Sequence, residues 1–332
     1  MYARVLVAGL FVVGGALFLV LNASADRWGP SAASPQETSW EEVSRRGEAL
    51  RSEPLPAPLD RLVPLAVAKG RPGPDDWLAQ HEEEGQSLAQ WRASDPVRVT
   101  PERRTIYLQP VGNYTEEEEA VVALTSDYVE RFFGVPVTTL PAWSAQSIPE
   151  SARRKNPLSG QSQLWTEYVL KRLLDARPPD ALALLALTAE DLYPAEDWNF
   201  VFGQASLTER IGVWSAHRNG DPAGTEAERA LYLRRTLATA THELAHMLGI
   251  LHCVAWECLA NGINHQEEAD RAPLGLCPHD LAKLTEATGV DPLAHHEALA
   301  EFWKGRDAEE HARFARGAEA LRIAPGAEAP AP

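Results

Sequence analysis

Residues 242–252 read HELAHMLGILH, and this stretch decides more about the chain than any other. His242 and His246 are four residues apart, so on a helix their imidazoles lie on one face and can bind the same metal ion. Gly249 lets the chain leave the helix through a turn that residues with a Cβ resist, and His252 then returns as a third ligand. Three protein ligands with one open position are typical of a catalytic zinc site.

Glu243 follows His242 directly, so its carboxylate is placed to take a proton from a water that attacks the substrate. With Zn²⁺ and this residue as general base and then general acid, the site would hydrolyse peptide bonds. The stretch therefore predicts a zinc metallopeptidase acting on a peptide or protein substrate. The alternative is a zinc-stabilised peptide- or protein-binding module without catalytic activity. His265 and Tyr232 are candidates for stabilising the oxyanion.

The upstream sequence predicts the frame around this stretch. Thr225 and Glu228 form a capping box that opens a long helix, and Gly249 ends it. Before it, apolar runs alternate with helical periodicity. Strands are predicted over 105–108, 135–140, 181–187, 200–205 and 211–215, and helices over 116–133 and 163–176. This succession predicts an α/β fold with a mixed, mostly parallel sheet packed on the active-site helix.

The three cysteines of the chain all follow the histidine stretch within a short distance. Three thiolates and one further ligand would suit a closed, structural zinc site, so a second Zn²⁺ is predicted beside the catalytic one. A disulfide or buried free thiols are the alternatives. The predicted ligands are Cys253, Cys258 and Cys277, with Asp280, His279 or His265 as the fourth.

The N-terminus has the pattern of an export signal. Arg4 precedes an unbroken apolar run over residues 5–21, and Ala23-Ser24-Ala25 is a small-x-small cleavage site. We expect residues 1–25 to be a cleaved signal peptide or a membrane anchor, and the protein to be exported, periplasmic or secreted, or tethered to the membrane. Residues 26–70 are rich in proline and predict a tether with a short helix near residues 40–50. A disordered tail is predicted over residues 317–332.

The composition limits the possible partners. The net charge is −16, from 47 acidic and 31 basic residues, which argues against nucleic acid because phosphate backbones would be repelled. Hydrophobic residues make up 45% of the chain, enough for a globular domain with its own core. We expect a monomer.

The combined pattern resembles the archaemetzincins, a branch of the metzincin metallopeptidases. The resemblance rests on the histidine stretch joined directly to Cys253, on Cys258, on Cys277-Pro278, and on the segments 201–205 and 212–215. It implies a zincin-like α+β domain over residues 71–316, with an N-terminal subdomain over 71–249 and a small C-terminal subdomain over 250–316.

The resemblance also implies details of both sites. An antiparallel edge strand would bind the peptide as an added strand, through Phe202, Gly203, Gln204 and Ala205. Family members hold a structural zinc with four cysteines, whereas the fourth position here is Asp280. The methionine that lies under the zinc ligands in metzincins is replaced by Ala260.

Overall fold

The centre of the fold is β7 (Ala181–Thr188), whose sequence ALALLALT is buried at every position. It lies in a seven-stranded sheet with the order β1-β2-β9-β10-β7-β3-β4. In this computed structural model, which describes residues 11–13, 16–21, 40–196, 198–206 and 208–322, four neighbouring strands run parallel. They are β10 (Ile211–Ser215), β7, β3 (Thr105–Val111) and β4 (Val137–Thr139). β9 (Gly203–Ser206) pairs antiparallel with β10, so the predicted mixed sheet is confirmed.

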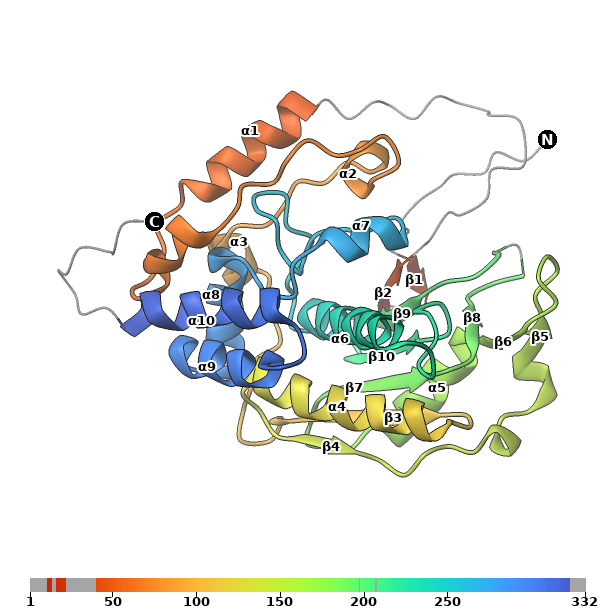
Figure 1. Ribbon diagram of the computed structural model, residues 1–332. Coiled ribbons are helices and arrows are strands. Elements are labelled where there is room, and N and C mark those ends of the chain that lie inside the picture. The colour runs from red at the N-terminus through yellow and green to blue at the C-terminus, as the bar shows by residue number, and fades with distance from the viewer. Residues whose placement is uncertain (1–10, 14–15, 22–39, 197, 207, 323–332) are drawn as a thin grey trace.

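Helices cover both faces of this sheet, which explains why β7 is apolar throughout. Successive residues of a strand point to opposite faces, and the core divides accordingly. Leu184 and Ala186 pack with α5 (Thr166–Ala176), while Ala183 and Leu185 pack with α4 (Glu116–Phe133) and α6 (Glu226–Met247). In Figure 1, α6 runs across the sheet at the centre of the molecule.

The remaining elements lie around this core. A second, three-stranded sheet has β5 (Arg153–Lys155), β6 (Ser162–Trp165) and β8 (Asp191–Tyr193). The C-terminal part contains α7 (Gln266–Arg271), α8 (Pro278–Thr288), α9 (Pro292–Trp303) and α10 (Ala308–Arg322), of which the last three gather beside α4 and α6 (Figure 1). The helix predicted from residue 163 begins instead at Thr166, because residues 162–165 pair as β6.

Two strands of the predicted export signal are described. β1 (Phe11–Val13) and β2 (Ala16–Leu21) form a hairpin, and β2 pairs antiparallel with β9, Leu19 opposite Ala205 and Leu21 opposite Gly203. The rest of the predicted signal, residues 1–10, 14–15 and 22–25, lies outside the described residues. Within the described ranges, no helix combines the length and the apolar character needed to cross a bilayer.

The predicted tether over residues 26–70 is wrong for its second part. Residues 26–39 lie outside the described residues. The short helix predicted near residues 40–50 is confirmed as α1 (Trp40–Arg51), but α1 and the short 3-10 helix Leu59–Leu65 pack on the body instead of forming a tether. Leu59 and Leu62 enter the main core, and Arg61 Nη1 donates to Leu321 O at 3.1 Å. Two isolated leucines between prolines give no periodic signal, so the sequence pattern missed this contact.

The predicted tail begins too early. α10 continues through Gly317 to Arg322, with Ala318 and Leu321 buried, and residues 323–332 lie outside the described part of the chain. Gly317 is a close approach between helices, since a Cβ there would lie 2.2 Å from His296 Cδ2. A glycine that resembles a helix end in the sequence therefore serves packing instead.

Two short helices before the sheet, α2 (Trp77–Gln80) and α3 (Leu88–Ala93), lie against the C-terminal part of the chain. Trp77 N donates to both carboxylate oxygens of Glu268, and Val99 N donates to Ala287 O at 2.8 Å. This segment of the predicted N-terminal subdomain thus packs with the predicted C-terminal one.

Candidate functional site

α6 carries the first two histidines into the interior. Its N-terminus has the predicted capping box, in which Thr225 and Glu228 satisfy each other's backbone N–H groups. Its last turns are buried, and Gly249 follows with a φ of 81°, the left-handed conformation expected of this turn. A Cβ on Gly249 would lie 3.1 Å from Pro96 Cβ, so the turn is both left-handed and closely packed.

The structure brings His242, His246 and His252 together, and their nearest ring nitrogens all lie within 4.8 Å of one another. His242 Nδ1 is 2.8 Å from Leu259 O, and His246 Nδ1 is 2.6 Å from Ile250 O. A carbonyl only accepts, so both Nδ1 atoms carry the proton and both lone pairs lie on Nε2. The Nε2 atoms of His242 and His246 face each other at 2.8 Å.

This arrangement fits a bound cation. Burial, followed by the neighbouring imidazoles, lowers the pKa of His242 to about 4 and that of His246 well below its usual value, so both rings are neutral near pH 7. Two lone pairs that face each other repel unless a positive ion lies between them. Among the described residues, the buried His252 Nε2 has no hydrogen-bond partner. This nitrogen is therefore available as a third metal ligand. Three converging imidazole nitrogens are ligands that Zn²⁺ prefers.

Glu243 is 1% exposed and lies beside this cluster in the chain. Neither of its carboxylate oxygens has a hydrogen-bond partner within the described part of the protein. Burial raises the pKa of this carboxyl to about 8. A buried carboxyl without a partner is costly for the fold, which indicates a role other than structural support.

His252 differs from the other two histidines in its support. Its Nδ1 lies 2.7 Å from Glu83 Oε1, and the same oxygen accepts from Trp77 Nε1 at 2.9 Å. Burial raises the pKa of Glu83, but the hydrogen bond and charge of His252 outweigh this and the pKa is lowered. The third imidazole is therefore held by a carboxylate from a distant segment.

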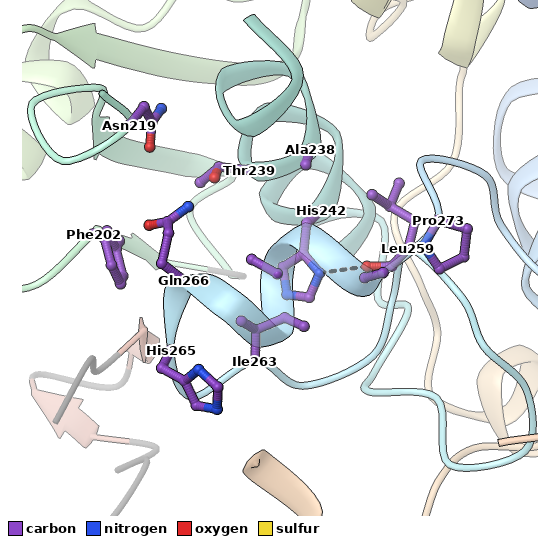
Figure 2. A pocket seen from close by; sticks show the side chains of 12 residues that line it. Phe202, Asn219, Ala238, Thr239, His242, Leu259, Ile263, His265, Gln266 and Pro273 are labelled. Carbon is purple, nitrogen blue, oxygen red and sulfur yellow. Dashed lines mark hydrogen bonds between the residues drawn. The ribbon is translucent and has the colours of Figure 1, made fainter. Parts of the chain in front are cut away.

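A pocket of about 70 Å³ opens beside His242 and is shown in Figure 2. Most of its lining is apolar, and it lies between α6, α7 and the segment before β9. The lining residues are Phe202, Asn219, Ala238, Thr239, His242, Leu259, Ile263, His265, Gln266, Ala269, Ala272 and Pro273. One of the four predicted substrate-binding residues, Phe202, is among them.

The other predicted substrate residues lie along β9. Ser215 N donates to Phe202 O at 2.8 Å, and backbone groups alternate in an antiparallel pair. The backbone N–H and C=O groups of Phe202 and Gln204 therefore point toward β10. Those of Gly203 and Ala205 point toward the opposite edge of β9, where β2 pairs. The Gln204 side chain accepts a hydrogen bond from Thr166 and is buried.

The second cluster contains all three cysteines, each of them buried and free, so the disulfide alternative is not what the structure contains. One donor atom from each of Cys253, Cys258, Cys277 and Asp280 lies within 4.8 Å of the others. Asp280 Oδ2 lies 3.3 Å from Cys258 Sγ and 3.2 Å from Cys277 Sγ. Backbone N–H groups also donate to sulfur, as Cys277 N does to Cys258 Sγ at 3.1 Å. Three sulfur donors and one oxygen donor in a buried site fit a structural zinc.

The geometry decides between the candidate fourth ligands. Cys277 caps α8, and its sulfur accepts from Asp280 N, which turns Asp280 back toward the thiols. The His279 ring is engaged elsewhere: its Nδ1 accepts a hydrogen bond from Trp256 Nε1, and its Nε2 lies within hydrogen-bond distance of Glu53 O. The candidate His265 lies elsewhere, paired with Asp76 at 3.0 Å.

The other residues singled out in the sequence, His265, Tyr232 and Ala260, make contacts that support the fold. His265 caps α7 and lines the pocket, so it stays near the site, whereas Tyr232 packs in the main core. Ala260 lies in the turn at residues 259–260, where its carbonyl accepts from Cys253 N at 2.8 Å. The preceding carbonyl, Leu259 O, holds His242, so backbone atoms support the ligand where the side chain is small.

Two residues near the clusters were not predicted. Glu83 holds His252, and Lys283 Nζ lies 2.7 Å from Asp280 Oδ1 in a pair that is almost fully buried. Glu83 lies in an acidic run that resembles a solvated surface, and Lys283 occupies a helix position that usually faces solvent. The three-residue spacing of Asp280 and Lys283 on a helix is the only signal that could have indicated their pairing.

Known proteins resemble this chain over most of its length. Residues 169–286 match the model of peptidase family M54. The chain is 31% identical to archaemetzincin-2 of Homo sapiens over 297 residues, which cover 80% of this chain and 81% of that protein. It is 33% identical to archaemetzincin-2 of Rattus norvegicus over 259 residues, which cover 68% and 72%. A crystal structure of archaemetzincin from Methanopyrus kandleri has 26% identity and a TM-score of 0.46, and the match covers 58% of this chain and 99% of that one.

Proposed function

Because the chain belongs to the archaemetzincin family of zinc metallopeptidases, peptidase family M54, we propose that it hydrolyses peptide bonds at the His242, His246 and His252 centre. The observation that carries this proposal is the buried, unpartnered Glu243 carboxylate beside three imidazoles whose Nε2 atoms converge. Zinc bound by these imidazoles would polarise the scissile carbonyl and lower the pKa of the attacking water to about 7.

Glu243 then has two tasks in the proposed mechanism. Its carboxylate takes a proton from the water as the water oxygen bonds to the carbonyl carbon. The same carboxyl gives this proton to the amine nitrogen as the carbon–nitrogen bond breaks. The residue needs no other partner for either step, which agrees with its two unpartnered oxygens in the described structure. With His252 as the proposed third ligand, we propose that the site is of the metzincin type.

The apolar pocket beside His242 supports a preference in the substrate. Leu259, Ile263 and Pro273 line it, and among the residues that the structure describes no lysine, arginine or carboxylate does. We propose that it accepts an apolar side chain next to the scissile bond.

A peptide-library cleavage assay with and without a chelator tests the activity and this preference together. Chelator-sensitive cleavage with apolar residues at one position beside the cut is the expected result. Binding of peptides without cleavage would instead favour the zinc-stabilised binding module.

We also propose that a peptide binds along the outer edge of β9, in the place that β2 takes. Ala205→Pro removes an N–H that faces this edge and is expected to raise KM about 2- to 10-fold, as for one lost hydrogen bond, with little change in kcat. Steady-state kinetics on a cleaved peptide measure this. Ala205→Gly keeps the N–H and should raise KM less than the proline does. Equal KM values for both variants would remove this edge from the substrate site.

Export would free that edge. We propose that residues 1–25 are a signal that is removed after Ala25, which takes β2 away from β9. N-terminal sequencing of the protein recovered from outside the cytoplasm should then begin at Asp26. Recovery of the full chain beginning at Met1 would contradict cleavage and favour the anchor.

A further inference from the structure

The arm, residues 77–91, contacts the turn that joins the second and third histidines. Gln86 Nε2 donates to Gly249 O at 3.1 Å, and Leu251 N donates to Gln86 Oε1 at 3.2 Å. Trp91 Nε1 donates to Leu248 O at 3.0 Å. The arm therefore makes hydrogen bonds to the backbone groups of a turn that has no regular secondary structure. The arm itself lies outside residues 169–286, which match the family model.

Glu83 holds a ring nitrogen of His252, while Trp77, also in the arm, packs edge-on against the same ring with 5.1 Å between the ring centroids. His242 and His246 direct their Nδ1 protons to backbone carbonyls at 2.8 and 2.6 Å. His252 lies in an irregular segment, and Glu83 Oε1, at 2.7 Å, takes the place of such a carbonyl. With its Nδ1 fixed in this way, the Nε2 of His252 is the atom that can face the other two rings.

Two groups besides His252 donate hydrogen bonds to Glu83. Its Oε1 also accepts from Trp77 Nε1 at 2.9 Å, and its carbonyl accepts from Arg46 Nη1 at 2.9 Å. Trp77 is fixed in turn by Glu268, whose carboxylate accepts from Trp77 N. The carboxylate is therefore a preorganised acceptor and needs little rearrangement to serve His252.

We propose that Glu83 is the positioning residue for the metal centre: it binds the Nδ1–H of His252 and so sets the direction and basicity of the third ligand. This inference rests on the proposed zinc centre. Carboxylates that hold the second nitrogen of a ligating histidine fix its tautomer and strengthen its donor nitrogen, and their loss costs about 10- to 100-fold in metal affinity.

Metal titration of the full-length protein tests this without relying on activity. Cobalt(II) reports the two centres separately, because thiolate ligands add a charge-transfer absorption that imidazoles lack. Glu83→Gln and Glu83→Ala are expected to weaken cobalt and zinc at the imidazole centre by about 10- to 100-fold, with the larger loss for alanine. The thiolate absorption should stay as in the wild type for both variants. The unfolding midpoint of the metal-free protein should stay as in the wild type for Glu83→Gln, whose amide oxygen can still accept from Trp77 Nε1.

Glu84→Gln is the matched control, because Glu84 is the next residue and is exposed. It should bind metal as the wild type does. If the Glu83 variants bind metal as tightly as Glu84→Gln, Glu83 does not position the ligand. If they lose both centres together with a lower unfolding midpoint, Glu83 supports the fold in general, and the inference is equally overturned. A wild type that binds no metal at the imidazoles would refute the proposed function itself.

Discussion

Glu243→Gln is expected to lower kcat for peptide hydrolysis by about 10²- to 10⁴-fold, the usual contribution of a general base, while the metal content stays unchanged. Glutamine has nearly the same shape but cannot take a proton. The side chain is buried and, among the described residues, makes no hydrogen bond, so the substitution removes no structural contact. Burial also favours the neutral amide over a carboxylate, so stability should not fall.

Kinetics on a cleaved peptide and zinc analysis of the same preparation measure this. Glu226→Gln is the matched control, because Glu226 begins the same helix and is exposed. It should retain both the rate and the metal. A Glu243→Gln protein that cleaves as fast as the wild type would disprove the proposed mechanism, and one that loses zinc would point to a ligand role for Glu243.

The predictable parts of the centre are those that local sequence controls. The four-residue spacing of His242 and His246 and the left-handed turn at Gly249 need only helix geometry and one glycine. Cys253, Cys258 and Cys277 are close in the chain, and the cap of α8 turns Asp280 toward them. The capping box and the apolar run of β7 were recognisable for the same reason.

The parts that could not be predicted depend on contacts between distant segments. Glu83 and His252 are 169 residues apart, and Lys283 donates to Gln86 O across 197 residues. No spacing rule relates such pairs, so an acidic run looked like a solvated surface. The errors in the predicted tether and tail have the same cause. Leu62 packs in the main core and Gly317 packs against His296, and the residues next to them in the chain do not indicate either contact.

The strongest effect on stability is expected at the second centre. We propose that the cysteine cluster binds a second Zn²⁺. Cys258→Ser should then reduce zinc from two ions to one per chain and lower the free energy of unfolding by several kcal/mol, since structural zinc contributes about 10–16 kcal/mol in small zinc-finger peptides. Cys258 is fully buried, and its sulfur accepts from the backbone of Ala260 and Cys277. Without the ion, the thiols of Cys253 and Cys277, the new hydroxyl, Asp280 and the charged Lys283 would remain buried together.

Denaturant unfolding with metal analysis measures both quantities. The matched pair is the wild type and Cys258→Ser, both stripped of all zinc, and the stabilities of these two metal-free proteins should be close. Cys258→Ser should also weaken zinc binding at the imidazole centre. Cys253 follows His252 directly, and Leu259 O, next to Cys258, accepts from His242 Nδ1. A wild type with one zinc per chain, or a variant as stable as the wild type, would mean that the cysteines are buried thiols without a metal. In that case Lys283→Met, which leaves the buried Asp280 carboxylate without its charged partner, would destabilise the protein more than Cys258→Ser.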